Sequence, residues 1–164
     1  MATDSLIDAS ASPNSPPPDE VNALLSFGYT LLTGEAVSAV VATGLDPGVG
    51  VIHSEGNDKP SLALDLMEEF RPLVVDSVVV ELLRRNQLSK ASFRAEQGRG
   101  GFLLTHEGRK IVLAAFEERM LQLFSYPATG KRVSYRRALY LQAQAVSRSI
   151  QNGAVDYVPV RWRI

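Results

Sequence analysis

The residues with the clearest potential for chemistry are one histidine and two carboxylates: His53, Asp65 and Glu68. Asp65 and Glu68 are three residues apart, so on a helix their side chains would share one face. An imidazole that converges with two carboxylates suits Mg²⁺ or Mn²⁺ better than zinc, because hard oxygen donors favour these ions. Such an ion could stabilise charge on a phosphodiester and activate an attacking hydroxyl. The sequence thus predicts a divalent-metal site at which all three residues are ligands and act in catalysis.

Spacing alone leaves a simpler interpretation open. A pair of acids three residues apart is often just the solvated face of a helix, and a single histidine in a glycine-rich loop is often a surface residue. Short motifs of this kind match by chance in many unrelated sequences. The metal site therefore needs support from the elements that would position its ligands.

Two helices and the loop between them would position the three residues. Apolar residues spaced from Val21 to Val41 predict a first helix, with Asp19 as its N-cap and Gly44 just past its end. Gly34 inside this helix is interpreted as a close contact with another helix. Residues 45–60 are rich in glycine and predict the loop that carries His53. A second helix is expected from Ser61, kinked or interrupted at Pro72, with these residues buried: Leu62, Leu66, Leu73, Val74, Val78 and Leu82.

The remainder of the chain predicts one short strand and two more helices. Residues 102–104 form the strand, Thr105 caps a third helix, and a fourth helix runs from about Ser134 to Gly153. Their inward residues are expected to be Val112, Ala115, Phe116, Met120 and Leu123 in the third helix, and Leu139, Ala143, Val146 and Ile150 in the fourth. The predicted fold class is mainly α: a helical, bundle-like domain over residues 19–164, which ends in an extended segment. Residues 1–18, rich in serine, alanine and proline, predict a disordered tail.

Charge divides the chain into two halves. Residues 1–83 hold 2 basic and 13 acidic residues, a net charge of −11, whereas residues 84–164 hold 15 basic and 5 acidic residues, a net of +10. One interpretation is a metal-collecting half beside a half that binds a polyanion. The other is two halves of one fold that attract each other. Phosphate contact by the second half would use Lys131, Arg132, Arg136, Arg137 and Arg148, unless these residues are simply a solvated helix face.

Composition excludes several classes of protein. The chain has no cysteine, which excludes disulfides, zinc–thiolate sites and thiol catalysis. Its first residues lack the positive start and apolar stretch of a secretory signal, and no uncharged apolar run approaches the length of a membrane span. We expect a cytoplasmic protein with no membrane partner.

Several segments resemble, in order, one family: the universal CRISPR-associated adaptation protein that acts as integrase and endonuclease. DEVNALLSFGYTLL at 19–32 resembles the start of its helical domain, and GLDPGVGVIH at 44–53 resembles its metal-histidine loop. DLMEEFRP at 65–72 resembles its acidic helix. LTHEGRK at 104–110 and the region from YLQAQ at 140–144 to RWR at 161–163 resemble its C-terminal end.

The resemblance implies a helical catalytic domain that binds DNA and a divalent metal. His53 would be the metal histidine, and Asp65 and Glu68 the acidic pair. From its place just after that pair, Arg71 could bind Glu68 or contact a phosphate. The family joins the 3′ ends of short DNA to a CRISPR repeat array by transesterification, using Mg²⁺ or Mn²⁺. It works as a homodimer that assembles with a small ferredoxin-like partner, "Cas two".

The sequence departs from the family pattern at its start. A complete member has an upstream β-rich domain and a first catalytic glutamate, and residues 1–18 match neither. We therefore expect a truncated chain, either an integrase that lacks one ligand or a non-catalytic remnant that serves only as a DNA-binding or assembly module. An unrelated helical DNA-binding protein would need a recognition helix-turn-helix, which the sequence does not show.

Overall fold

The computed structural model describes residues 19–46, 61–96, 101–153 and 157–160. The expected tail at 1–18, the loop that carries His53 and the end of the chain at 161–164 lie outside the described residues. The described elements are, in chain order, α1 (Glu20–Ala42), α2 (Ser61–Glu68), the π-helical segment η1 (Arg71–Asp76), α3 (Ser77–Arg84), the 3₁₀ turn η2 (Lys90–Ser92), β1 (Phe93–Ala95), β2 (Phe102–Leu104), α4 (His106–Leu121), β3 (Leu123–Ser125), β4 (Arg132–Ser134) and α5 (Tyr135–Asn152). The mainly α fold class is confirmed.

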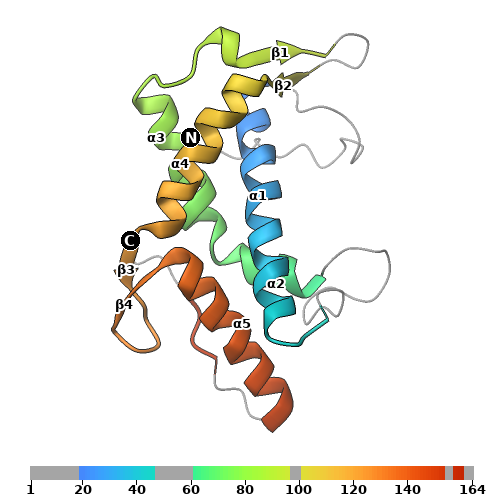
Figure 1. Cartoon of the computed structure of the whole chain (residues 1–164), viewed down its shortest axis with the longest axis vertical. Coiled ribbons are helices and arrows are strands. Elements are labelled where there is room, and N and C mark those ends of the chain that lie inside the picture. Colours follow the sequence, from blue (N-terminus) through green and yellow to red (C-terminus); the bar gives the residue numbers. More distant parts are fainter. Residues whose placement is uncertain (1–18, 47–60, 97–100, 154–156, 161–164) are drawn as a thin grey trace, which may run out of the picture.

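Helix α1 is the central element of the fold (Figure 1). Its N-cap is Asp19, whose carboxylate accepts a hydrogen bond of 2.7 Å from the backbone N–H of Asn22, as predicted. The helix contacts α2, α4 and α5, and its buried residues include Leu24, Leu32 and Val40. By length and composition alone α1 could cross a membrane. In this fold its buried face belongs to the hydrophobic core, so α1 serves as a core helix.

The close contact expected at Gly34 lies instead at Gly28. A Cβ on Gly28 would come within 2.5 Å of Cγ1 of Val75, whereas nothing in the described structure lies within 4 Å of a Cβ on Gly34. The interpretation of Gly34 was therefore wrong. Gly28 lets α1 approach η1 at a distance that a larger residue would prevent.

The second predicted helix is interrupted near Pro72, as expected. Helix α2 ends at Glu68, and η1 continues the chain with Pro72 in its first turn before α3 begins. Proline has no N–H to donate to a preceding carbonyl, so a regular helix cannot pass through it unchanged. All six residues predicted to face inward are buried: Leu62, Leu66, Leu73, Val74, Val78 and Leu82.

Two short antiparallel hairpins complete the fold (Figure 1). The predicted strand β2 pairs with β1, with Arg94 opposite Leu103, and β3 pairs with β4, with Phe124 opposite Val133. The partner strand β1 and the β3–β4 hairpin were not predicted, because three-residue strands carry too little periodicity to detect.

Helices α4 and α5 begin at the predicted caps. Thr105 and Ser134 each accept a hydrogen bond of 3.2 Å from a backbone N–H three residues on, and Gly153 ends α5 with a φ of +64°. Most predicted inward residues are at least partly buried. Leu123 and Ile150, at 51% and 55% exposed, are the exceptions. Leu123 lies in strand β3 rather than in the helix, and Ile150 lies in the last turns of α5, beyond the core.

Candidate functional site

The acidic pair lies on the last turns of α2. Asp65 is partly buried and Glu68 is exposed. The Glu68 carboxylate accepts a hydrogen bond of 2.7 Å from Arg71, at the start of η1. Residues at i and i+3 share one helix face, so Asp65, Glu68 and Arg71 follow one another at this spacing along the chain.

Arg71 links this acidic turn to α1. Its guanidinium lies 4.2 Å from the centre of the Tyr29 ring, and the Tyr29 hydroxyl donates a 2.7 Å hydrogen bond to Asp76 at the end of η1. Burial lowers the pKa of Arg71, but the hydrogen bonds with Glu68 and Tyr29 outweigh it and the net pKa is raised. Burial, and then Asp76, raise the pKa of Tyr29. The acidic turn is therefore held in place by a network of aromatic and charged side chains.

Glu69, between the acidic pair and Pro72, binds the C-terminal segment at residues 157–160 through hydrogen bonds. Its carboxylate accepts hydrogen bonds from the Tyr157 hydroxyl at 2.5 Å, the Val160 backbone N–H at 2.8 Å and the Gln142 side chain at 3.2 Å. Gln142 is fully buried and also accepts a 3.0 Å hydrogen bond from the Tyr126 hydroxyl. Burial, and then Glu69, raise the pKa of both tyrosines. We call this set of residues the Glu69 network.

Sequence reasoning missed the Glu69 network. Glu69 appeared only as the second glutamate of the DLMEEFRP segment, and Tyr157 as part of an extended ending. The one available signal was a charged residue placed directly before Phe70, which is fully buried. A carboxylate in such a position needs several donors, because burying an unpaired charge is costly.

The acidic turn supplies some, but not all, of the ligands that a hard divalent cation needs. In the residues that the structure describes, no group of three or more histidine, aspartate or glutamate side chains could hold a metal ion. Asp65 and Glu68 supply two carboxylates on one turn, and oxygen ligands of this type suit Mg²⁺ or Mn²⁺. His53 lies outside the described residues, so the predicted convergence of the three ligands stays a prediction.

The predicted DNA-binding residues fall into different environments. Arg136 is bound by two carboxylates, Glu35 of α1 at 2.9 and 2.7 Å and Glu117 of α4 at 2.9 and 3.0 Å. These hydrogen bonds raise its pKa. Arg136 thus joins the acidic and basic halves of the sequence. This agrees with the interpretation of the charge asymmetry as two halves of one fold that attract each other.

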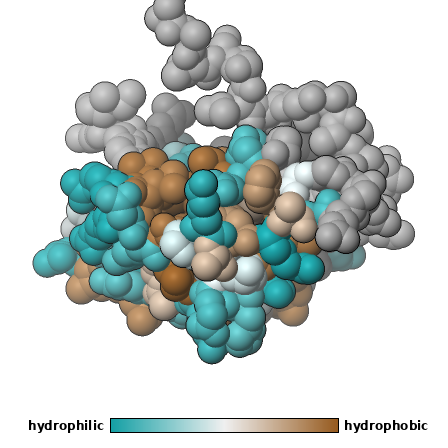
Figure 2. Space-filling view, turned by 90° about the horizontal axis from the view of Figure 1, so that it is seen from above, coloured by the Kyte–Doolittle hydropathy of each residue, from teal (hydrophilic) through white to brown (hydrophobic). Residues whose placement is uncertain are grey.

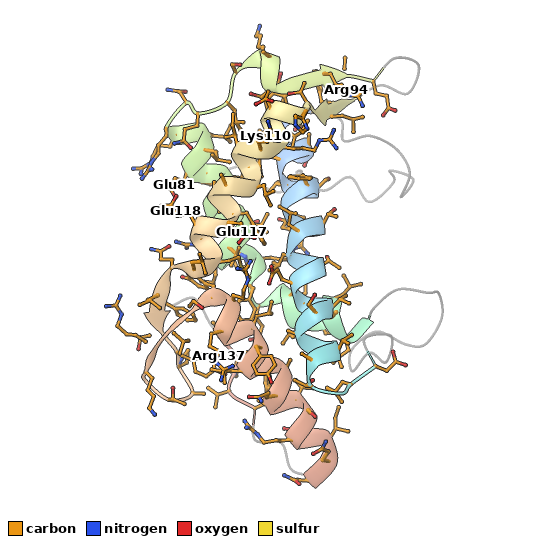
Figure 3. All side chains as sticks on the ribbon, viewed as in Figure 1. Glu81, Arg94, Lys110, Glu117, Glu118 and Arg137 are labelled. Atoms are coloured by element: carbon orange, nitrogen blue, oxygen red, sulfur yellow. The ribbon has the colours of Figure 1, made fainter. Side chains whose placement is uncertain are left out.

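The other candidates are more accessible. Lys131, Arg132, Arg137 and Arg148 are all exposed. Lys131 and Arg132 lie on the β3–β4 hairpin, and Arg137 lies 5.0 Å from the ring centre of Tyr140 on α5. Figure 3 shows Arg137 on α5, well away from Arg94 at the other end of the molecule. Exposure leaves these four free to contact phosphates, while Arg136 already has two partners.

Residues 11–118, more than half of the chain, match the family described as CRISPR associated protein Cas1. A protein from Rhodospirillum rubrum named CRISPR-associated endonuclease Cas1 2 is 45% identical over 148 residues, covering 90% of this chain and 43% of that protein.

Two solved structures have the same fold. A casposase bound to its integration product superposes with a TM-score of 0.79 at 25% identity, covering 88% of this chain and 42% of the casposase. A Cas6-RT-Cas1–Cas2 complex superposes with a TM-score of 0.77 at 26% identity, covering 91% of this chain and 16% of the matched chain. The chain therefore spans less than half the length of these relatives. The family match over more than half of the chain, together with the shared fold, shows that this chain belongs to the Cas1 family.

Proposed function

We propose that the chain is the helical catalytic part of a metal-dependent DNA endonuclease and integrase that acts in CRISPR spacer acquisition. The observation that carries the proposal is the acidic turn of α2, held against α1 by Arg71 in a fold similar to a casposase bound to an integration product. A rigid support of this kind is what a catalytic metal site needs, because ligands must be positioned before the metal and substrate bind.

In this proposal His53, Asp65 and Glu68 hold Mg²⁺ or Mn²⁺. The ion would stabilise charge on the phosphodiester and activate the attacking hydroxyl. Glu68 already bonds Arg71 at 2.7 Å, so the guanidinium offers a positive charge beside the acids that could contact a DNA phosphate. The exposed residues Lys131, Arg132, Arg137 and Arg148 would contact further phosphates without reading sequence.

The proposed partners are DNA, a second copy of the chain and a small Cas2-type protein. Support for the last comes from the similarity to the Cas1 part of a complex that contains Cas2. A cytoplasmic location accompanies this function, since the substrate is cellular DNA.

A strand-transfer and nuclease assay in Mn²⁺ tests the proposal. The chain has two histidines, which provide a matched pair: His53→Ala should abolish activity, and His106→Ala, at the exposed start of α4, should leave it unchanged. Asp65→Asn should act like His53→Ala. Calorimetric titration with Mn²⁺ should show weaker binding in the same two variants only.

Persistent activity in His53→Ala would exclude this metal site. Absence of activity in the wild-type chain, with DNA binding retained, would favour the alternative of a non-catalytic DNA-binding or assembly module.

A further inference from the structure

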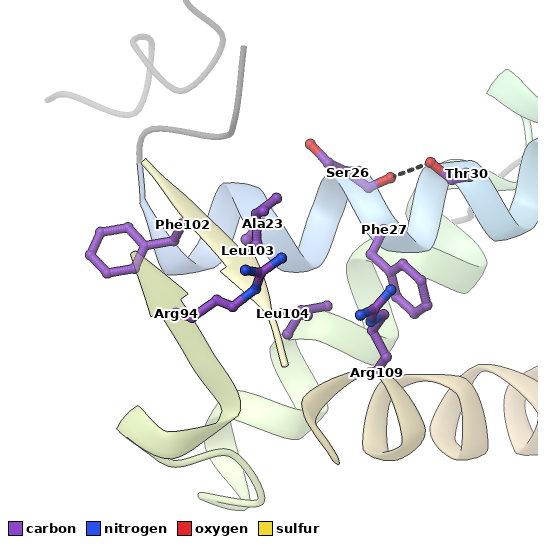
Figure 4. Close-up of a pocket in the computed structure, with 9 residues that line it drawn as sticks. All are labelled: Ala23, Ser26, Phe27, Thr30, Arg94, Phe102, Leu103, Leu104 and Arg109. Atoms are coloured by element: carbon purple, nitrogen blue, oxygen red, sulfur yellow. Dashed lines mark hydrogen bonds between the residues drawn. The ribbon is translucent and has the colours of Figure 1, made fainter. Parts of the chain in front are cut away.

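A pocket lies beside the N-terminal half of α1, where the β1–β2 hairpin and the start of α4 face this helix (Figure 4). Its volume is about 230 Å³. The floor and walls are largely apolar and include Phe27, Leu103 and Leu104, and the hydroxyl residues Ser26 and Thr30 line the α1 side. Figure 2 looks onto this end of the molecule and shows apolar surface between hydrophilic side chains.

Two arginines line the same pocket. Arg94 comes from β1 and Arg109 from the first turn of α4, and Figure 4 shows both guanidinium groups directed toward α1. Both residues are exposed. Over the described ranges neither side chain takes part in a hydrogen bond or ion pair, and no acidic residue lines the pocket. The fold therefore places two positive charges around an apolar cavity, and none of the described residues that line it carries a negative charge.

This combination selects a class of ligand. A purely apolar molecule would gain nothing from two guanidinium groups, and a bare phosphate ion would gain nothing from the apolar floor. A nucleotide has both features, because arginine forks bind phosphate oxygens well and a base stacks on an aromatic ring. The base must be unpaired to enter, so a duplex does not fit this description.

We propose that this pocket binds one nucleotide unit, with its phosphate at Arg94 and Arg109 and its base against Phe27. The unit belongs either to a single strand of nucleic acid or to a free nucleotide. If the ligand is a single strand, this inference rests on the proposed function and adds a second contact site for that strand. The pocket uses residues of α1 just one turn from Tyr29, which contacts Arg71 of the acidic turn, so a bound strand could run from one site toward the other.

Fluorescence anisotropy with a labelled single-stranded oligonucleotide, in EDTA and without metal, tests the pocket independently of catalysis. Arg94→Gln combined with Arg109→Gln should weaken binding about tenfold. The matched control, Arg84→Gln with Lys90→Gln, removes two exposed charges away from the pocket and should change binding less than about twofold. Phe27→Leu keeps every charge and should weaken binding about fivefold or more.

The arms of the experiment assign the source of the ligand. Competition by a mononucleotide would identify a free nucleotide, and its absence would identify a strand; either result agrees with the pocket. Equal losses in the pocket and control variants, or equal losses on a duplex and a single strand, would overturn it. A chain that binds a strand through the pocket yet shows no Mn²⁺-dependent activity would contradict the proposed function alone.

Discussion

The charged side chains at the two ends of α1 differ in whether they have partners of opposite charge. Where α1 meets α4 and α5, Glu35 and Glu117 both bind Arg136, so every charge in this group has a partner. At the hairpin end, Arg94 and Arg109 line a pocket to which no carboxylate of the described residues contributes. We call these regions the Arg136 junction and the hairpin pocket. All three arginines look alike in the sequence, and the difference shows that a count of basic residues does not identify those available to a polyanion.

The Glu69 network extends the paired region, and it carries the largest predicted effect on stability. Glu69→Ala would leave the Tyr157 hydroxyl and the Val160 N–H without their acceptor, and the Gln142 amide would keep only its bond to the Val158 carbonyl. Loss of a charged acceptor from partly buried donors should lower the free energy of unfolding by about 2–4 kcal/mol. Urea denaturation measures this.

The neighbouring residue supplies the control. Glu68 is exposed and makes one ion pair with Arg71, so Glu68→Ala should cost less than about 1 kcal/mol. Similar losses in the free energy of unfolding for Glu69→Ala and Glu68→Ala would show that the Glu69 network stabilises the fold no more than a surface ion pair does.

Removal of Arg136 tests the junction directly. Arg136→Met keeps the apolar part of the side chain but leaves two carboxylates facing each other, so the free energy of unfolding should fall by about 1–3 kcal/mol. Arg137→Met, next in sequence and exposed, should cost less than about 1 kcal/mol. The difference should shrink in high salt, because the carboxylates are only partly buried.

Tyr157 should make the stability of the folded chain depend on pH. Burial and the hydrogen bond to Glu69 raise its pKa above the ordinary 10.0, so the folded chain holds this proton more tightly than the unfolded chain. Its contribution to stability is then fully present below pH 10 and is lost as pH rises above that value toward the folded-state pKa. Tyr157→Phe should cost about 1–1.5 kcal/mol at pH 7. It should also show a shallower loss of stability above pH 10.

Equal slopes for Tyr157→Phe and wild type in alkaline denaturation would contradict this assignment. Tyr140→Phe is a suitable control, because among the described residues the Tyr140 hydroxyl makes one hydrogen bond, which it accepts from the Gln144 side chain at 3.2 Å.

The hairpin pocket should show the smallest effect on stability. Arg94→Gln and Arg109→Gln remove charges that bind no partner within the described structure, so each should change the free energy of unfolding by less than about 0.5 kcal/mol. A loss as large as that of Arg136→Met would show that these arginines are structural, and the contrast between the two ends of α1 would fail.

The sequence by itself determined most of the helical framework. Asp19, Thr105, Ser134 and Gly153 limit the helices because caps act on backbone groups a few residues away. Pro72 interrupts the second predicted helix because its ring leaves no N–H to donate. The order of the motifs along the chain also identified the family.

Only the tertiary structure decided which charges are paired and which contacts are close. Arg136 and Glu35 are 101 residues apart, and Tyr157 and Glu69 are 88 apart, so no local pattern connects them. Gly28 rather than Gly34 is the close contact because Val75 happens to pack there. Caps and periodicity act over one or two turns of a helix, whereas the availability of a charged side chain depends on distant segments that folding brings beside it.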